Sequence, residues 1–543
     1  MTATRPPLED EDGPDTAGRF TPEDEVELEL RRRARKVSRR QFLPRAAAAA
    51  AGLVAAGAVG YELPHRSGSR RSAATAKPET PSSTPTATAT PATSRVQAFL
   101  TRPDLRPPVV RVTQMGATPE STPRFIVMSP INAVPNSEPQ QGLMMIDRQG
   151  RLVWFSPSSS GSPFNLGVQS YAGKPALTWW QGAVINAHGE GLGEIGDETF
   201  RSIKTIRAGH GLTTDLHDLQ LTARGTALIT AYETTTADLT SIGKSSKGQV
   251  FVGHVQEVDL NTGRVLFDWR SLDHVGIAES FQPAPLAGQG YDYFHLNSVA
   301  EMDDGHLLIS GRNTCTLYKV DRSTGQILWR LGGKHSDFSV SSEAVFWWQH
   351  DARPHGLSAI SVLDNEGPHK GKQSRGLVLS VDSAAKRVDL TRAFVHPAGF
   401  ITATLGNVDV QSDGGAFIGW GAQSYFSHYA SDGTMILDGE LPIGVRSYRA
   451  HLVDWVGHPA DGPRVVAQEN PAGGFAVHAS WNGATEVARW TVLAGSEKSA
   501  MSEVGSQAWT DFETAIAVNS NGPYFGVVAL DSNGRELGRS PIA

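Results

Sequence analysis

The chain has 543 residues, a formal net charge of −7 at pH 7 and one cysteine, Cys315. The small negative charge and the scattered Lys and Arg residues argue against nucleic acid as a partner, because nucleic-acid-binding surfaces carry a basic stripe interleaved with aromatic side chains. A single cysteine excludes an internal disulfide, so we expect the folded part of the chain to be stabilised by packing.

Residues 1–62 have the features of an export signal. An acidic stretch is followed by a basic cluster that ends at Lys36, and this composition buries too little apolar surface to fold. Residues 38–43 then read S-R-R-Q-F-L, which matches the twin-arginine pattern, and an Ala- and Gly-rich apolar run follows at 46–61. The sequence predicts a disordered N-terminus, export by the twin-arginine translocase and an extracytoplasmic location.

Residues 63–105 are predicted to be a linker. They are dominated by Ala, Thr, Pro and Ser, which cannot build a core. Small-x-small sites at 56–58 and 74–76 offer positions for signal cleavage, and without cleavage the short apolar run would leave an N-terminal membrane tether. The folded body is then expected over residues 106–543, as one domain.

A hairpin pattern repeats through this body. Each copy has an apolar strand that ends in Asp, a turn with Gly, and a second apolar strand. Its Asp residues are Asp147, Asp259, Asp321 and Asp531, with weaker copies at Asp382 and Asp432. Asp259, Asp321 and Asp382 are 62 and 61 residues apart, a spacing that suits four-stranded blades with loop insertions.

The strand pairs between these hairpins, such as residues 216–229 and 296–309, are expected to be inner strands of the blades. No segment of comparable length shows helical periodicity, and turn residues recur too often for long helices. The sequence therefore predicts an all-β protein, a β-propeller of six to eight blades.

Five polar residues stand at the ends of predicted inner strands: His217, His295, Asn297, Arg312 and His350. Inner strands of a propeller surround a central channel, so we expect these side chains to converge on one axial pocket. For each His alone, an imidazole bonded within its own blade explains the residue equally well, but the whole set in one register favours a site. The set argues against zinc, because it lacks carboxylate and thiolate partners and includes an arginine. Three imidazoles, one amide and one guanidinium suit a tetrahedral oxyanion such as sulfate or phosphate.

These positions resemble those of the bacterial arylsulfotransferases. The resemblance lies in L-H-D-L at 216–219, H-L-N at 295–297, S-G-R at 310–312, Q-H at 349–350 and S-Y-R-A-H-L-V-D-W-V-G-H-P at 447–459, and it spans roughly residues 120–540. It implies a propeller that moves a sulfuryl group from a phenolic sulfate ester to a phenol acceptor, without a nucleotide donor or a cofactor. The chain departs from the familiar enzymes in its single cysteine and in the little room it leaves for their N-terminal β-domain.

The resemblance also assigns roles to the residues. His350 would be the nucleophile that becomes transiently sulfated, while His217, His295, Asn297 and Arg312 would bind the sulfuryl oxygens and one His would carry a proton. Aromatic residues have two explanations, an acceptor cleft or packing between blades. These aromatic residues are Trp347, Trp348, Trp420 and Tyr425.

Two other classes of protein compete with this interpretation. The D-x-x-T-G-x-x-L-W hairpin also resembles the repeat of quinoprotein dehydrogenases, but a vicinal disulfide is impossible here and no carboxylate cluster for calcium stands out. A non-catalytic exported scaffold is the other alternative, and a buried pair of His350 and Arg312 would argue against it. Other His residues, among them His254, His274, His335 and His355, are expected to be structural or on the surface.

Overall fold

The computed structural model describes residues 94–118, 122–132, 138–159, 161–366, 373–471, 473–520 and 522–543. The predicted export signal and most of the predicted linker lie outside these residues. The described chain is built of antiparallel β-sheets, and its helical segments are the short 3-10 turns η1 (Thr240–Ile242), η2 (Ser271–Asp273), η3 (Ile277–Glu279) and η4 (Ser342–Ala344). Among the residues described, no helix has the length and apolar character needed to cross a membrane. The all-β prediction is confirmed.

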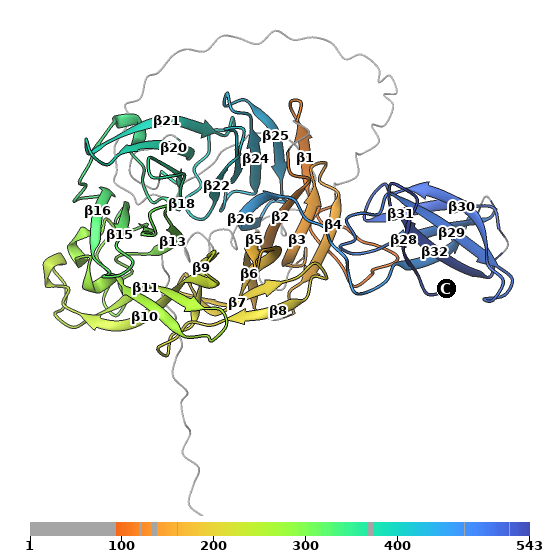
Figure 1. The fold of residues 1–543 in the computed structure, drawn as a ribbon, viewed down its shortest axis with the longest axis horizontal. Helices are drawn as coiled ribbons and strands as arrows, with labels where there is room; N and C mark the ends of the chain where they lie inside the picture. The colour runs from red at the N-terminus through yellow and green to blue at the C-terminus, as the bar shows by residue number, and fades with distance from the viewer. Residues whose placement is uncertain are drawn as a thin grey trace, which may run out of the picture.

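Six groups of strands, called ring units 1 to 6, make up the larger part of the described fold (Figure 1). Unit 1 contains β2 (Phe125–Asn132), β3 (Gly142–Asp147), β4 (Leu152–Pro157) and β26 (Val445–Val453). Unit 2 contains β5 (Ser162–Tyr171), β6 (Lys174–Ile185), β7 (His188–Gly196) and β8 (Ser202–Ile206). Unit 3 contains β9 (Thr214–Leu221), β10 (Thr226–Ala237), β11 (Gly248–Asp259) and β12 (Val265–Arg270).

The other three units follow in chain order. Unit 4 contains β13 (Leu296–Glu301), β14 (Leu307–Gly311), β15 (Thr316–Val320) and β16 (Ile327–Gly332). Unit 5 contains β18 (His350–Pro354), β19 (Ala359–Asp364), β20 (Arg375–Asp382) and β21 (Arg387–Val395), with β17 (Ser339–Val340) at its edge. Unit 6 contains β22 (Asn407–Val410), β23 (Ala416–Gly419), β24 (Tyr425–Tyr429) and β25 (Met435–Glu440), with β1 (Arg111–Gln114) on its outer edge.

The units close into a ring. Their inner strands contact one another in the order β5, β9, β13, β18, β22, β26 and back to β5 (Figure 1). β26 comes from the end of this part of the chain and pairs with β2 from its beginning, so one sheet joins both ends. Units 2 and 3 also share a single bridge, between Gly191 and Thr214. Antiparallel sheets in this arrangement are consistent with a propeller, with six units among the described residues.

The predicted Asp turns cap the outer hairpins of the ring. Oδ1 of Asp259 accepts the backbone N–H groups of Asn261 and Thr262 at 3.0 and 2.7 Å, and Gly263 has a φ of 71°. The equivalent carboxylates of units 1, 4, 5 and 6 bind their own turns in the same way, namely Asp147, Asp321, Asp382 and Asp432. Large side chains fill the wedges between units, as Trp269 and Tyr318 do between units 3 and 4. The hairpin prediction is confirmed at these positions.

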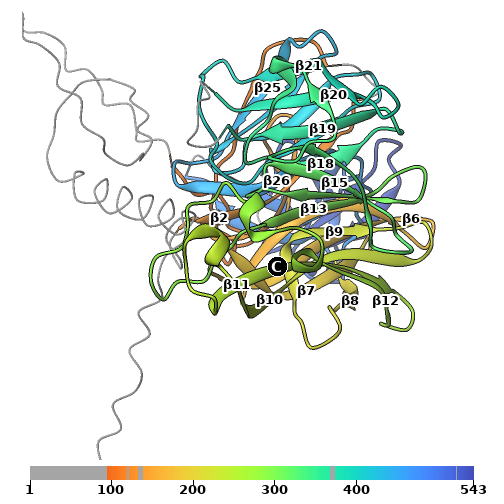
Figure 2. The same ribbon diagram turned by 90° about the vertical axis from the view of Figure 1, so that its left-hand side faces the viewer.

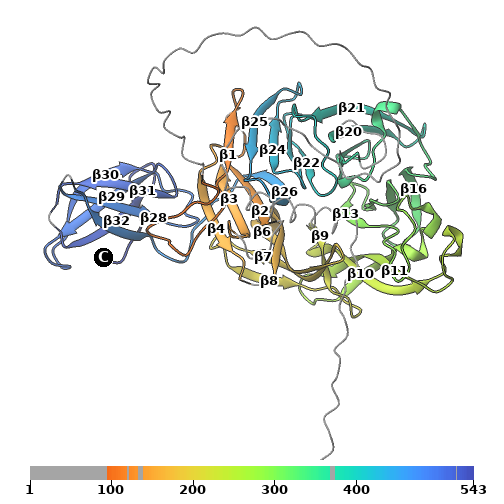
Figure 3. The ribbon, with the colours of Figure 1, turned by 180° about the vertical axis from the view of Figure 1, so that it is seen from behind.

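The last strands form a separate sandwich, which stands beside β4 in Figures 1 and 3. One sheet contains β27 (Arg464–Glu469), β28 (Phe475–Ser480) and β31 (Glu513–Val518); the other contains β29 (Arg489–Gly495), β30 (Ser502–Ala508), β32 (Tyr524–Leu530) and β33 (Glu536–Arg539). In the described part of the chain these strands pair only with one another, and they enclose a core of their own. The prediction of one propeller over 106–543 is therefore wrong for 464–543. The Asp531 hairpin shares the local turn chemistry of the ring hairpins, but turn chemistry does not decide which sheet a hairpin joins.

The end of the predicted linker is also packed rather than extended. Leu105 is fully buried, the Phe99 and Phe512 rings lie 4.4 Å apart, and the N–H of Thr101 donates to Glu513 of the sandwich at 2.6 Å. Asn482 of the sandwich also exchanges two hydrogen bonds of 2.9 Å with the backbone of Phe155 in β4 of unit 1. Residues 94–105 thus belong to the folded body and help hold the sandwich against unit 1. Figure 2 shows the ring from the side.

Candidate functional site

The five predicted residues come together at the inner strands of the ring. His217 lies in β9, His295 directly precedes β13, Asn297 lies in β13, Arg312 follows β14 and His350 begins β18. None has more than 7% of its surface exposed. The rings of His217 and His295 are 4.8 Å apart, and both His217 and His350 lie against Tyr448, at 5.9 and 6.3 Å. Nδ2 of Asn297 donates to the carbonyl of Gln349, the residue before His350, at 2.6 Å.

Two of the three imidazoles are backed by a carboxylate. Nδ1 of His217 is 2.6 Å from Asp215, and Nδ1 of His295 is 2.5 Å from Asp292. Burial raises the pKa of Asp215, but the neighbouring His217 and His188 outweigh it and lower that pKa to about 2. Burial also raises the pKa of Asp292, but His295 and His188 outweigh it and hold that pKa far below the usual range. Both groups are carboxylates at neutral pH, so they accept the Nδ1–H of their imidazoles.

The third imidazole, His350, is backed by an amide. Its Nδ1 is 2.8 Å from Oδ1 of Asn365, whose Nδ2 donates to the carbonyls of Thr402 and Leu405 at 2.9 Å each. These two bonds identify Oδ1 as the acceptor, so Nδ1 of His350 carries the proton and Nε2 carries the lone pair. The backbone N–H of Leu405 donates to Nε2 at 3.2 Å.

Electrostatics keep the His350 imidazole neutral. Burial and the positive charge of Arg312 lower its pKa well below 6.5; the Asn365 hydrogen bond opposes this, and His295 and His217 add to the lowering. A neutral imidazole with its proton fixed on Nδ1 is a nucleophile at Nε2. Arg312 itself lies over the Trp348 ring at 4.7 Å and donates to Asn313 and to the carbonyl of Ala403 at 3.0 and 3.2 Å. Among the described residues, the hydrogen-bond acceptors of its guanidinium are thus an amide oxygen and a backbone carbonyl rather than a carboxylate.

Strained backbone accompanies the site. His295, Trp348 and Asp351 have φ values of 51°, 54° and 56°. Each such residue costs of order 1–3 kcal/mol and persists only where the surrounding contacts enforce it. Trp348 and Asp351 lie on either side of His350 in the chain, and His295 is the imidazole that contacts Asp292.

A buried charge network lies directly beside the imidazoles. Asp218 follows His217, Asp351 follows His350, and both carboxylates pair with Arg353 and Arg449. The four distances between charged atoms run from 2.7 to 3.2 Å. The network joins β9, β18 and β26, and further bonds from the N–H groups of Val299 and Val408 reach it from β13 and β22. It therefore fixes the spacing of the strands that carry His217 and His350.

The aromatic candidates divide into two kinds. Trp420 is fully buried and its Nε1 donates to Ser427, and Trp348 is 3% exposed beneath Arg312. These two side chains pack within the ring. Trp347 and Tyr425 are partly exposed, and Trp347 meets Phe281 edge to face at 5.1 Å. The role of the latter two in an acceptor cleft stays a prediction.

The residues that back the imidazoles were missed by the sequence reasoning. Asp215 and Asp292 precede their histidines by two and three positions, so a D-x-H or D-x-x-H pattern was present. Asn365 and His188 had no such signal, because they reach the site from other strands. The predicted structural role of His254 and His274 agrees with their contacts, an Asp268 partner at 2.8 Å and a stacked Trp269 ring at 5.2 Å.

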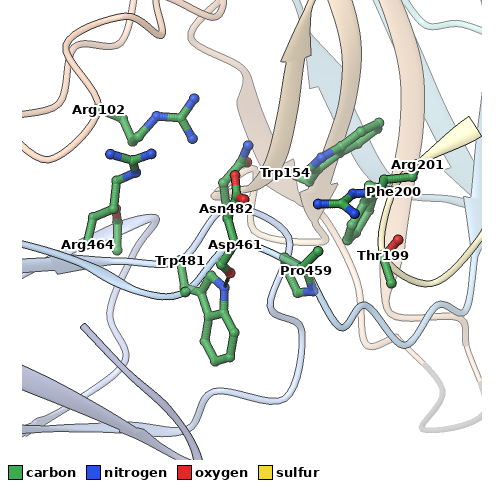
Figure 4. A pocket seen from close by; sticks show the side chains of 13 residues that line it. Arg102, Trp154, Thr199, Phe200, Arg201, Pro459, Asp461, Arg464, Trp481 and Asn482 are labelled. Carbon is green, nitrogen blue, oxygen red and sulfur yellow. Dashed lines mark hydrogen bonds between the residues drawn. The ribbon is translucent and has the colours of Figure 1, made fainter. Parts of the chain in front are cut away.

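A cavity of about 200 Å³ lies elsewhere, between units 1 and 2 of the ring and the sandwich (Figure 4). Trp154, Phe200 and Arg201 line it from the ring side, and Arg464 and Trp481 line it from the sandwich. None of the predicted site residues contributes to its wall. This cavity is therefore separate from the imidazole site.

A closed ring of antiparallel sheets that carries three buried imidazoles at its inner strands and a buried guanidinium after β14 defines an all-β ring protein with a polar site at these strands. The particular family follows from the sequence of the ring. The family described as arylsulfotransferase (ASST) matches residues 167–441, about half of the chain, and the chain belongs to this family. The matched range includes all five predicted site residues and runs from within β5 to just past β25.

Comparisons with other proteins add little beyond this. The search of curated proteins gives no match. A protein of unknown function from Bacteroides caccae is 11% identical, with a TM-score of 0.37 over 61% of this chain and 98% of that one. A protein from Lactobacillus plantarum is 11% identical (TM-score 0.32; 74% and 100% covered), and Sqt1 of Saccharomyces cerevisiae is 11% identical (TM-score 0.30; 68% and 96% covered).

Proposed function

We propose that the protein transfers a sulfuryl group from a phenolic sulfate ester to a phenol, through a sulfated intermediate at His350. The observation that carries this proposal is the state of the His350 imidazole, which is neutral, buried and protonated at Nδ1. Membership of the arylsulfotransferase family supports the same activity. The proposal includes a six-bladed propeller whose inner strands present the site, and export by the twin-arginine translocase on the signal at residues 38–43.

The first half of the reaction forms a nitrogen–sulfur bond. The lone pair on Nε2 of His350 attacks the sulfur of the ester, and the bond from sulfur to the phenolic oxygen breaks with its electron pair on that oxygen. A doubly protonated His217 or His295 gives the departing oxygen the proton on its Nε2 and becomes neutral, while it keeps the Nδ1–H that the ionised Asp215 or Asp292 accepts. Arg312 donates to the sulfuryl oxygens, where negative charge is spread in the transition state.

The second half reverses these roles with a new phenol. The acceptor gives its proton to the same imidazole as its oxygen attacks sulfur, and the nitrogen–sulfur electron pair returns to Nε2 of His350. The backbone of Leu405 takes part in both halves, because its N–H donates a hydrogen bond to Nε2 of His350 in the ligand-free site. This hydrogen bond must break before Nε2 attacks, and the N–H of Leu405 is then available to an oxygen of the bound ester.

The test is a two-substrate assay on the full chain. With 4-nitrophenyl sulfate as donor, we expect nitrophenolate release that depends on an added phenol, ping-pong kinetics, and loss of release in His350→Gln. His254→Gln is the matched control, because His254 is also buried in the ring but pairs with Asp268 away from the site. The proposal fails if folded wild-type protein shows no acceptor-dependent release with a broad panel of phenols, or if His350→Gln keeps the wild-type rate.

A further inference from the structure

We propose that His188 is a positioning residue of this site, which holds the Asp292 carboxylate and through it orients the His295 imidazole. The inference rests on the proposed function for its catalytic consequence, although the orientation itself can be measured without turnover. His188 comes from unit 2, whereas Asp292 and His295 precede unit 4.

One carboxylate oxygen serves both imidazoles. Oδ2 of Asp292 is 3.3 Å from Nε2 of His188 and 2.5 Å from Nδ1 of His295. All three side chains are buried, with 5% of His188 and 1% of His295 exposed. Because both rings lie against the same oxygen, the carboxylate cannot rotate away from His295 without also breaking its contact with His188. The ring of His295 also packs against the ring of His217, with the two centroids 4.8 Å apart and the planes nearly perpendicular.

Packing fixes the His188 ring in place. Its centroid is 3.9 Å from that of Tyr232 and 4.9 Å from that of Phe251, both of which belong to unit 3. The OH of Tyr232 donates to the carbonyl of Leu296 at 2.9 Å, which ties the same aromatic wall to β13. His188 is therefore held by aromatic side chains of unit 3, one of which is hydrogen-bonded to unit 4.

A tight turn brings His188 to this position. β6 and β7 are joined by a two-residue turn in which Asn186 and Ala187 have φ values of 50° and 64°, and Ile185 pairs with His188. The next residue, Gly189, donates its N–H to Oδ2 of Asp215. The same turn thus contacts the carboxylates behind both His295 and His217. Only glycine fits at 189, since a Cβ there would lie 2.4 Å from the backbone nitrogen of Leu216.

The same three residues can be considered as a metal site, because their ligand atoms lie within 4.8 Å of one another. Asp292 adds a carboxylate to the imidazoles, which the predicted set of site residues lacked. Two ligands bound at about 2.0–2.1 Å to one tetrahedral zinc ion are separated by roughly 3.3 Å. The 2.5 Å between Asp292 and His295 is a hydrogen-bond distance instead. The geometry favours a hydrogen-bonded positioning group, and metal binding is an outcome that the experiment can reveal.

The experiment compares two replacements of His188 in the full chain. His188→Gln keeps an N–H donor toward Asp292, whereas His188→Met fills similar volume without one. Loss of the residue that orients a metal-binding imidazole costs about 10–100-fold, and we take the same factor as the expected effect of losing the partner that orients the His295 ring. We expect His188→Met to lower kcat by that factor with little change in the KM for 4-nitrophenyl sulfate, and His188→Gln to recover most of the rate.

A second readout does not depend on turnover. The ¹⁵N NMR signals of the His295 ring report which nitrogen carries the proton, and we expect Nδ1–H in the wild type and in His188→Gln but a tautomer mixture in His188→Met. A His295 signal unchanged in His188→Met would overturn the positioning role, even if that variant lost activity. A wild type without sulfuryl transfer but with this NMR response would refute the proposed function alone. Stoichiometric zinc in the wild type, lost in both variants, would replace the positioning role by a metal site.

Discussion

Replacing Arg449 by methionine removes one of two positive charges that neutralise Asp218 and Asp351. Arg449 donates to Asp218 at 2.9 Å through Nη1, lies 3.2 Å from Asp351 through Nε, and reaches the carbonyl of Asn297 at 3.4 Å. All four charged side chains of the network are at least 80% buried. Burial raises the pKa of Asp218, but Arg353 and Arg449 outweigh it and hold that pKa well below its usual range. The variant therefore leaves a net negative charge in the centre of the ring.

The size of the effect follows from the charge that is stranded. Methionine has similar length and adapts its shape, so the cavity contribution is small. Breaking a buried ion pair by removing one partner costs about 3–5 kcal/mol, because the remaining charge stays desolvated. We therefore expect Arg449→Met to lower the free energy of unfolding by about 3–5 kcal/mol. Adding Asp218→Asn restores neutrality through Asp351 and Arg353, so the double variant should be more stable than the sum of the single losses by roughly 1–3 kcal/mol.

Urea unfolding of the single and double variants, followed by near-UV circular dichroism, measures both quantities. Arg539→Met is the control, since Arg539 is 60% exposed in an ion pair with Glu536 of the sandwich and is expected to contribute below about 1 kcal/mol. Equal losses in the Arg449 and Arg539 variants would contradict the reasoning. So would strict additivity in the double variant, because it would mean that the charges in the network do not interact.

The remaining predictions concern the imidazole site. Because the pKa of His350 lies well below 6.5, kcat/KM should decrease on the acidic side only below pH 6.5. Asn365→Asp supplies a carboxylate to Nδ1 of His350, so in that variant a pH–rate profile should show this decrease at a higher pH. The same lowered pKa means that the unfolded chain takes up a proton first as pH falls through about 6.5. Below that pH the free energy of unfolding therefore decreases by up to about 1.4 kcal/mol per pH unit. Urea titrations at several pH values should show a smaller decrease in His350→Gln. Arg312→Met should lower kcat/KM about 10²–10³-fold in the nitrophenolate assay. A loss under threefold would mean that Arg312 does not stabilise the transition state. Gly189→Ala should lower both stability and kcat, because its Cβ meets backbone, and a variant with wild-type melting temperature and rate would contradict the close approach at the turn.

Local chemistry explains what could be predicted from the sequence. The Asp259 turn is made by bonds to residues two and three positions away, so its pattern is complete within one short segment. The alternation of apolar strands and turns likewise determines an all-β chain. His217, His295, Asn297, Arg312 and His350 were recognisable because polar residues at the ends of buried strands are unusual and because their short motifs resemble one family.

Long-range pairing explains what could not be predicted. The Asp531 hairpin has the same turn bonds as the ring hairpins, yet β32 and β33 belong to the sandwich. Its membership depends on which sheet offers a complementary apolar face, and that is decided only when the strands pack. The packed segment at 94–105 has the same origin, because Thr101 and Phe99 find their partners more than 400 residues away.

The tertiary structure decided which partner sets His350 apart from the other two imidazoles. The sequence determined that the chain forms β-sheets and which histidines stand on their inner strands, and it places Asp215 and Asp292 within three positions of His217 and His295. It could not determine that His350 faces Asn365, or that His188 of another unit shares the carboxylate of His295. An imidazole is a neutral nucleophile or a proton carrier according to its partner and its burial, and both are fixed only when the ring closes.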